Sequence, residues 1–300
     1  MAGHRRFGTT GMMPTLISDD QAVLMAGVEA VKAAKEQQLP GILGVHIEGP
    51  FFSPAKRGTH KESWIRSPEA EDIQWLSELG KLRTIVTLAP EHTRKGQIQM
   101  LSDAGVMVCA GHTNALAADI DAAITEGLRG FTHLFNAMRP TEAREPGVVG
   151  AALDDSHTWC GLIADGHHVH PTVLRLAIAA KTKGKMLLVT DSMSTIGGQQ
   201  NTFQLYEETI REHDGKLVNA EGNLAGSAIS MIDAVKYAHL NVGVALDECL
   251  RMASLYPAEF LHIESQRGRI EHQFEADLVH FDEKTWQVQN TWISGQQQSH

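Results

Sequence analysis

Four short apolar runs in this chain each end on a residue capable of metal or acid–base chemistry. The runs end at Glu48, His112, His133 and Asp191. Near-continuous apolar runs of this length are typical of strands buried on both faces of a parallel sheet. In a parallel barrel the functional side chains gather at the carboxyl ends of the strands. The pattern therefore predicts a catalytic site made of one carboxylate, two imidazoles and a further aspartate.

Strand-like runs alternate with helical patterns over the first 190 residues. Strands are expected at 11–16, 42–47, 84–88, 106–110, 130–132, 159–163 and 186–189. Helices are expected between them at 21–38, 68–79, 97–104, 116–126 and 171–183. This order predicts an α/β fold, and a (β/α)8 TIM-like barrel is favoured over a doubly wound sheet. No GxGxxG follows the first strand, which argues against a dinucleotide-binding sheet.

The pattern changes after Asp191. Short strands are expected at 203–206, 209–213 and 216–218, then helices at 227–240 and 246–255, and alternating strands at 276–281 and 287–293. The tail 295–300 is expected to fray. We therefore expect a barrel domain over 1–274, with a β-hairpin insertion at 203–219, and the remnant of a small β-sandwich over 275–300.

The strand count leaves the predicted barrel incomplete. Seven barrel strands can be counted, and the one without a candidate belongs at the start of the chain. The last two strands likewise resemble half of a β-domain whose other half would precede residue 1. We therefore expect a barrel that lacks its first strand and exposes two unpaired sheet edges.

Composition excludes several function classes. The formal net charge is −10 and no Lys/Arg cluster is visible, so nucleic acid is not an expected partner. The longest apolar runs are too short to span a membrane, and no apolar core follows the basic residues near the start, so neither a membrane partner nor a secretory signal is expected. Cys109, Cys160 and Cys249 are far apart. They are expected to be buried thiols of a cytoplasmic protein.

Glu48, His112 and His133 together predict a catalytic metal site. Taken singly, the glutamate fits an exposed strand end, and each histidine fits a core or capping position. One carboxylate and two imidazoles leave a coordination position open, as catalytic sites require, whereas structural zinc sites usually use cysteine. These donors suit zinc, iron, cobalt or manganese, so the metal stays open.

The remaining candidates each have a structural alternative. Asp191 is a general base that takes a proton from water, or a cap of the next helix. Arg144 is a fork for an anion such as phosphate, or half of a surface ion pair. Asn136 and the neighbouring Ala137 would add donors. One of the histidines at 167–168 is expected to point into the barrel mouth.

A family resemblance covers nearly the whole chain. The motifs that show it are VHIEGPFF at 45–52 with KRGTH at 56–60, GHTNA at 111–115, THLFNAM at 132–138, REPG at 144–147, ADGHHV at 164–169, VTD at 189–191, LAGS at 224–227, LDECLRMAS at 246–254 and ADLV at 276–279. Together, and in this order, they resemble the N-acetylglucosamine-6-phosphate deacetylases of the amidohydrolase superfamily.

The resemblance implies an activity and its machinery. Members remove acetate from the 2-acetamido group of a sugar 6-phosphate, using a barrel and a small β-sandwich. It implies one divalent metal ion, with zinc as the first choice, held by Glu48, His112 and His133. It makes Asp191 the general base and then acid, and gives His60 the task of polarising the carbonyl.

The same resemblance assigns substrate contacts and an assembly. The residues it places against the sugar phosphate are Thr59, Asn136, Ala137, Arg144, His168, Leu224, Ala225 and Gly226. The last three would close over the substrate. Members are homodimers or larger, and a neighbouring subunit contributes to the phosphate site in this picture.

Two alternatives stay open. One keeps the fold and changes the substrate to N-acetylgalactosamine 6-phosphate or another cyclic amide. The other is a truncated, catalytically silent chain that binds a sugar phosphate or a partner without turnover.

Overall fold

The computed structural model describes all 300 residues, and the chain forms two compact units. One unit, called here the sheet unit, contains residues 13–161 and 180–185. The other, called the terminal unit, contains residues 1–12, 162–179 and 186–300. The domain division expected from the sequence, with a boundary at residue 275, stays a prediction.

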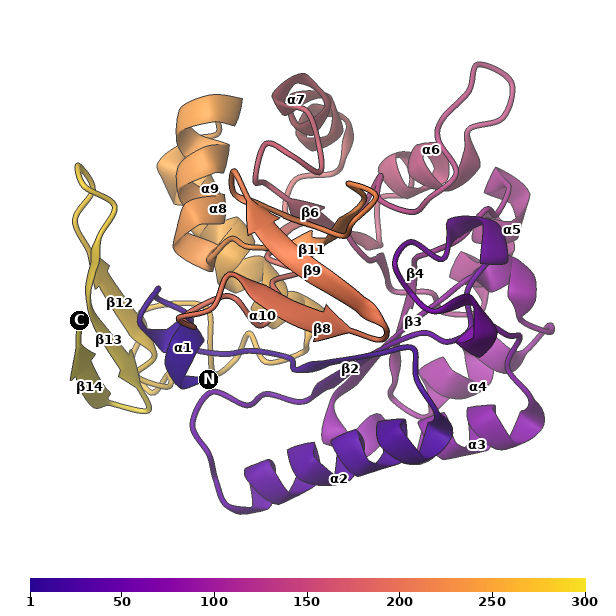
Figure 1. Ribbon diagram of the computed structural model, residues 1–300, viewed down its shortest axis with the longest axis horizontal. Helices are drawn as coiled ribbons and strands as arrows, with labels where there is room; N and C mark the ends of the chain where they lie inside the picture. Colours follow the sequence, from indigo (N-terminus) through magenta and orange to yellow (C-terminus); the bar gives the residue numbers. More distant parts are fainter. The chain divides into compact units, whose positions relative to one another are not determined.

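A parallel sheet organises the sheet unit (Figure 1). Its strands pair in chain order: β1 (Thr15–Ile17), β2 (Val45–Glu48), β3 (Thr84–Leu88), β4 (Met107–Ala110), β5 (Gly130–Phe131) and β6 (Trp159–Ile163). Ile17 lies opposite Glu48, and Glu48 lies opposite Thr87. The carboxyl end of β2 is therefore flanked by the carboxyl ends of both neighbours. All six of these strands were predicted, most with ends shifted by a few residues.

Helices connect consecutive strands of this unit. They are α2 (Gln21–Glu36), α3 (Ala70–Glu78), α4 (Gln97–Asp103), α5 (Ala117–Thr125) and α6 (Gly147–Asp154). Sequence reasoning missed α6, because two glycines and the preceding Pro146 are typical of a loop. The helix forms because Val148, Val149 and Ala152 are buried, and this burial offsets a poor intrinsic propensity.

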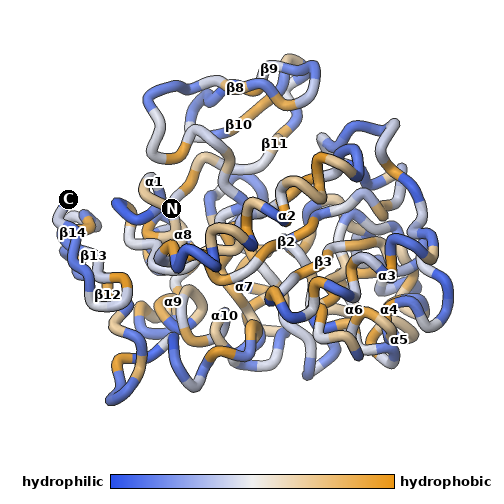
Figure 2. Tube along the Cα trace, turned by 90° about the horizontal axis from the view of Figure 1, so that it is seen from below, coloured by the Kyte–Doolittle hydropathy of each residue, from blue (hydrophilic) through white to orange (hydrophobic).

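The first long helix shows how the sequence specifies an element. Asp20 caps α2 by accepting a hydrogen bond from the Ala22 backbone N–H at 2.8 Å. Leu24, Val28 and Val31 are its buried residues, as their spacing predicted. Figure 2 shows hydrophilic and hydrophobic residues alternating along the helix.

Within the terminal unit, three helices pack against one strand. The strand β7 (Met186–Val189) packs against α8 (Met231–Tyr237), α9 (Leu246–Ala253) and α10 (Leu255–Phe260). Another helix, α7 (Pro171–Ala180), lies almost entirely in this unit. The strand β7 has the predicted bounds, and it ends directly before Thr190 and Asp191.

A four-stranded antiparallel sheet follows Asp191 along the chain (Figure 1). Its strands are β8 (Thr202–Leu205), β9 (Glu208–His213), β10 (Lys216–Val218) and β11 (Leu224–Ser227). Sequence reasoning missed β11 and began a helix at Ser227. Ile210, Leu217 and Ala225 form the buried cluster of this sheet. The strand forms because Ala225 joins that cluster and because β10 offers a pairing edge.

The chain ends in a three-stranded antiparallel sheet of β12 (Leu278–Phe281), β13 (Val288–Ile293) and β14 (Gln296–Ser299). The expectation of a frayed tail is wrong, because the chain turns at Ser294-Gly295 and β14 then pairs with residues 290–293 of β13. The short helix α1 (Ala2–Arg5) contacts this sheet, since the Arg5 guanidinium donates to the Thr291 hydroxyl at 3.1 Å.

None of the helices combines the length and the apolar character needed to cross a membrane.

Lys181 offers a test of how the sheet unit is held together. Its buried ammonium donates to the carbonyl oxygens of Ala152 and Asp155, which end α6. Lys181→Met leaves both carbonyls without this donor, so we expect the free energy of unfolding to fall by about 1–3 kcal/mol. Urea denaturation followed by circular dichroism measures the change. The matched control is Lys183→Met at an exposed position, where a loss as large as that of Lys181→Met would contradict the assignment.

Candidate metal centre

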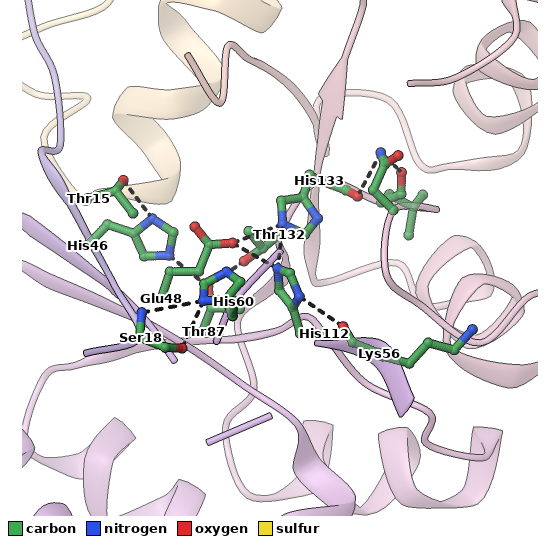
Figure 3. A network of polar contacts seen from close by, with 12 residues as sticks. Thr15, Ser18, His46, Glu48, Lys56, His60, Thr87, His112, Thr132 and His133 are labelled. Atoms are coloured by element: carbon green, nitrogen blue, oxygen red, sulfur yellow. Dashed lines mark hydrogen bonds and ion pairs between the residues drawn. The ribbon is translucent and has the colours of Figure 1, made fainter. Parts of the chain in front are cut away.

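Three predicted ligands lie together in the sheet unit (Figure 3). Glu48 Oε1 lies 2.9 Å from His133 Nε2 and 3.2 Å from His112 Nε2, and the two Nε2 atoms are 3.2 Å apart. All three residues are buried, with 4–6% of their surface exposed. Residues separated by up to 85 positions in the chain are thus brought to one point.

The carboxyl ends of three strands position these side chains. Glu48 is the last residue of β2, His112 lies two residues beyond β4, and His133 lies two residues beyond β5. Both histidines have positive φ angles, 50° for His112 and 33° for His133. Such angles are uncommon for residues other than glycine, and they persist where the surrounding structure enforces them, often at functional sites.

The loops that carry the two histidines are joined by Thr113. Its backbone N–H donates to the Ala137 carbonyl at 3.1 Å, and its own carbonyl accepts from Arg139 N–H at 3.0 Å. The Glu91 carboxylate accepts from the Thr113 hydroxyl at 2.5 Å and from the Asn114 N–H at 2.7 Å. These bonds offset the backbone strain at His112 and His133.

The tautomer of His112 follows from its partner. His112 Nδ1 lies 3.0 Å from the Lys56 carbonyl oxygen, which only accepts hydrogen bonds, so Nδ1 carries the proton and donates. The Nε2 atom of the neutral ring therefore presents a lone pair to Glu48 and His133. Metal-binding histidines are commonly oriented by a hydrogen bond of this kind.

The spacing of the three donor atoms fits a metal ion. Zinc is bound at about 2.0–2.1 Å by imidazole nitrogen and carboxylate oxygen, so neighbouring ligand atoms of a tetrahedral site are about 3.3 Å apart. The separations of 2.9–3.2 Å between the three donor atoms here are close to that distance. Without a cation or proton between them, the carboxylate oxygen and the His112 lone pair would repel each other. The group can therefore hold a divalent metal ion.

Burial sets the protonation of the group. Burial alone would raise the pKa of Glu48, but its close contacts with the His112 and His133 rings outweigh burial and hold that pKa well below its usual range. Burial also lowers the pKa of His46, His60 and His112, and it lowers that of His60 to about 3. An ionised carboxylate and neutral imidazoles are the forms that bind metals.

His60 lies beside the three candidate ligands. Its ring centroid lies 4.7 Å from that of His112, and both rings contact Phe52, which is fully buried. His60 Nδ1 lies 3.4 Å from the Ser18 backbone N–H, which can only donate, and 2.8 Å from the Ser18 hydroxyl. The lone pair of the neutral ring is therefore on Nδ1, and Nε2 carries a proton that it can donate.

Four predicted substrate residues also belong to the sheet unit, and they lie on loops. Thr59 lies in the turn just before His60. The Asn136 amide donates to the His133 and Leu134 carbonyls at 3.3 and 3.4 Å, so it supports the turn after the ligand. Ala137 has a φ of 52° in the same turn. Arg144 is exposed on the loop between β5 and α6.

The other predicted residues belong to the terminal unit. Asp191 follows β7 and has a φ of 51°, and its carbonyl accepts from Ser227 N–H at 2.8 Å. His168, whose side chain is 7% exposed, donates from Nδ1 to Asp165 Oδ2 at 2.6 Å. Residues 224–226 lie in β11, directly before Ser227, which donates to the Asp191 carbonyl. That Asp191, His168 and residues 224–226 form one site with the three candidate ligands stays a prediction.

Sequence reasoning missed the residues that orient the histidines. Ser18 directly follows β1, so the rule that functional residues follow barrel strands could have found it. The Lys56 carbonyl has no sequence signal, because any residue supplies the same backbone atom. Phe52 lies inside the VHIEGPFF motif but has no chemistry that would single it out.

Comparisons with known proteins agree with this geometry. The amidohydrolase family matches over residues 4–297. An N-acetylgalactosamine-6-phosphate deacetylase of Shewanella sp. (strain ANA-3) is 41% identical over 297 residues, which cover 99% of this chain and 75% of the relative. An N-acetylglucosamine-6-phosphate deacetylase of Vibrio furnissii is 33% identical over 292 residues, 96% of this chain and 73% of the relative.

Solved structures give the same result. The N-acetylglucosamine-6-phosphate deacetylase from Pasteurella multocida matches with a TM-score of 0.96 and 34% identity, covering 100% of this chain and 78% of that chain. A mutant of the Mycobacterium smegmatis enzyme, in complex with N-acetyl-D-glucosamine-6-phosphate, matches with a TM-score of 0.88 and 30% identity, covering 98% and 78%. The predicted fold class, an α/β barrel of the metallo-hydrolase type with part of a small β-domain, is confirmed.

The buried imidazoles predict how stability depends on pH. Their folded pKa values lie below the ordinary 6.5, so the unfolded chain takes up protons first as the pH falls. Stability is therefore present above pH 6.5 and is lost below it, by up to about 1.4 kcal/mol per pH unit for each such imidazole.

Urea denaturation between pH 7.5 and 5, with a chelator present, measures this loss. Most ordinary carboxylates stay ionised there, so histidines dominate the slope. His60→Asn removes one of the three groups and should flatten the curve. A slope unchanged by that substitution would contradict the low pKa of His60.

Proposed function

Since the chain belongs to the amidohydrolase family, we propose that it hydrolyses the 2-acetamido group of N-acetyl-D-glucosamine 6-phosphate, giving glucosamine 6-phosphate and acetate. The observation that supports this most is the buried convergence of Glu48, His112 and His133 in a chain 33–41% identical to amino-sugar-phosphate deacetylases. The three residues would hold one divalent ion, with zinc first and iron, cobalt or manganese as alternatives.

A divalent ion held by Glu48, His112 and His133 would polarise a carbonyl oxygen and lower the pKa of water. The chain's own contribution is to present three donors from three strand ends at nearly tetrahedral spacing. Two imidazoles and one carboxylate leave room for water and substrate, as catalytic sites do.

Asp191 is proposed as the residue that moves the proton. A carboxylate accepts a proton from water as the water oxygen adds to the amide carbon, and then gives it to the departing nitrogen as the C–N bond breaks. The products are acetate and the free amine, so one proton-carrying group serves both steps. Its place directly after β7, with a positive φ of 51°, is typical of a strained functional position.

His60 is proposed to bind the amide oxygen. Its Nε2–H can donate because Nδ1 accepts from the Ser18 backbone N–H. Since burial lowers the pKa of His60 to about 3, the ring stays neutral and acts as a hydrogen-bond donor rather than an acid. A preoriented donor of this kind stabilises the charge that develops on the oxygen as water adds.

The sugar phosphate is proposed to contact residues on several loops. Arg144 would bind phosphate, and its exposure leaves the guanidinium available for that contact. Thr59, Asn136, Ala137 and His168 would contribute further contacts, and residues 224–226 would cover the sugar. We further propose that the chain forms a homodimer or a larger homo-oligomer in the cytoplasm.

N-acetyl-D-galactosamine 6-phosphate is a second candidate substrate. The relative with 41% identity acts on the galactosamine compound by its name, whereas the Vibrio furnissii relative with 33% identity is named for the glucosamine compound. The two sugars differ in the configuration of one hydroxyl, and both carry the 2-acetamido group on which the proposed metal centre would act.

Acetate release tests the proposal and separates the alternatives. The purified chain is assayed with both sugar epimers, with and without a chelator. We expect release from N-acetylglucosamine 6-phosphate that the chelator abolishes and added zinc restores. Faster release from the galactosamine epimer would move the assignment to the second candidate. Bound metal without release from either sugar would instead favour the silent chain.

Asp191→Asn tests the proposed proton transfer. The amide keeps the size of the side chain but accepts no proton at neutral pH, so we expect kcat to fall by about 10²–10⁴. The substrate KM should change much less, because binding does not need the proton. Asp121→Asn, on the exposed face of α5, is the control and should leave kcat unchanged. Equal activity of both variants would remove Asp191 from the mechanism.

A further inference from the structure

A chain of side-chain hydrogen bonds runs across the sheet close to the ligand group (Figure 3). His46 Nδ1 lies 3.1 Å from the Thr15 hydroxyl, and His46 Nε2 lies 2.7 Å from the Thr87 hydroxyl. The Thr87 hydroxyl lies 2.6 Å from that of Thr132. These residues come from β1, β2, β3 and the end of β5, so the chain connects strands that are not neighbours.

Two of the three ligands are attached to the chain of hydrogen bonds by one or two residues of backbone. His46 precedes Glu48 by two residues on the same strand, and their side chains therefore share a face. Thr132 directly precedes His133. Moving either residue would move the backbone from which the ligand projects.

Gly111 places the backbone of the third ligand, His112, against Thr87 and Thr132. A Cβ atom on Gly111 would lie 2.5 Å from Thr87 Cγ2 and 3.2 Å from Thr132 Cβ. The backbone directly before His112 therefore packs against the pair of threonines, at a distance that no larger residue allows. His46, Thr87, Thr132 and Gly111 therefore form one layer of contacts beside the three ligands. Thr87 contacts each of the other three residues in this layer.

We propose that Thr87 is a positioning residue of the metal centre, which sets the spacing of the Glu48, His112 and His133 donors through its contacts with His46, Thr132 and Gly111. It does not touch the metal. This inference rests on the proposed metal centre and adds to it a residue without metal-binding chemistry. Metal sites depend on such supporting hydrogen bonds, and their loss typically weakens metal affinity by about 10- to 100-fold.

The strand β3 itself offers a matched control. Thr84 is as completely buried as Thr87, but its hydroxyl donates to the Leu79 carbonyl at 2.7 Å, outside the layer. Thr84→Val and Thr87→Val remove the same group from the same strand at similar burial. Both should reduce stability, and a merely structural role predicts the same metal affinity for the two variants.

The experiment measures zinc affinity of the full chain by competition with a chelator. We expect Thr87→Val to bind zinc about 10- to 100-fold more weakly than the wild type. We expect Thr84→Val to bind it within about twofold. Thr87→Ser keeps the hydroxyl and should restore most of the affinity. Cobalt-loaded protein gives a second readout, because the visible spectrum of cobalt changes with ligand geometry.

The outcomes separate this inference from the metal centre itself. A wild-type chain that binds no zinc would end the proposed metal centre. A wild-type chain that binds zinc, with Thr87→Val binding it equally well and with the same cobalt spectrum, would overturn the positioning role alone. Thr87→Ser binding as weakly as Thr87→Val would also overturn it, because the hydroxyl would not be responsible. If Thr87→Val does not fold, Thr132→Val removes the other partner of the Thr87–Thr132 hydrogen bond. The zinc affinity and cobalt spectrum of that variant are then judged by the same criteria.

Discussion

The convergence of one carboxylate oxygen and two imidazole nitrogens within 2.9–3.2 Å is the constraint on which the rest of this structure depends. A carboxylate oxygen and two imidazole nitrogens so close together and so deeply buried need a cation or a proton among them. Burial keeps the His112 imidazole neutral, and contact with His112 and His133 keeps the Glu48 carboxylate ionised. The Lys56 carbonyl turns the lone pair of His112 inward. The electrostatics of the site and its capacity to bind a metal thus follow from the same packing.

Holding this arrangement has a conformational cost that the surrounding contacts offset. His112 and His133 both have positive φ angles, a rare conformation for side chains of their size. Thr113 joins their loops through backbone hydrogen bonds, and the Glu91 carboxylate fixes Thr113 in turn. On the strand side, Thr87 and its partners support the backbone before each ligand. The ligands are therefore constrained from two directions, which is what preorganisation of a metal site requires.

The strand-end residues have separable tasks in the proposed reaction. Glu48, His112 and His133 supply the donors, His60 supplies a hydrogen bond to the developing oxyanion, and Asp191 moves the proton. His60 depends on Ser18 for its tautomer, just as His112 depends on Lys56. The orientation of these two imidazoles is thus set by a backbone atom of another segment. A backbone atom is present whichever residue occupies the position, so only the fold determines that contact.

The sequence by itself determined the order of most strands and helices and singled out the three proposed ligands, because buried strands leave continuous apolar runs that end on chemically distinct residues. Local patterns failed where burial or pairing overrides propensity, as in α6, which glycines disfavour, and in β11 and β14, which form on edges offered by β10 and β13. The tertiary structure alone decided which atoms of the histidines face the site, and that Thr87 lies at the centre of the layer beside the ligands. The physical reason is that a tautomer or a hydrogen-bond chain depends on partners from distant strands, and no spacing along one chain encodes those distances.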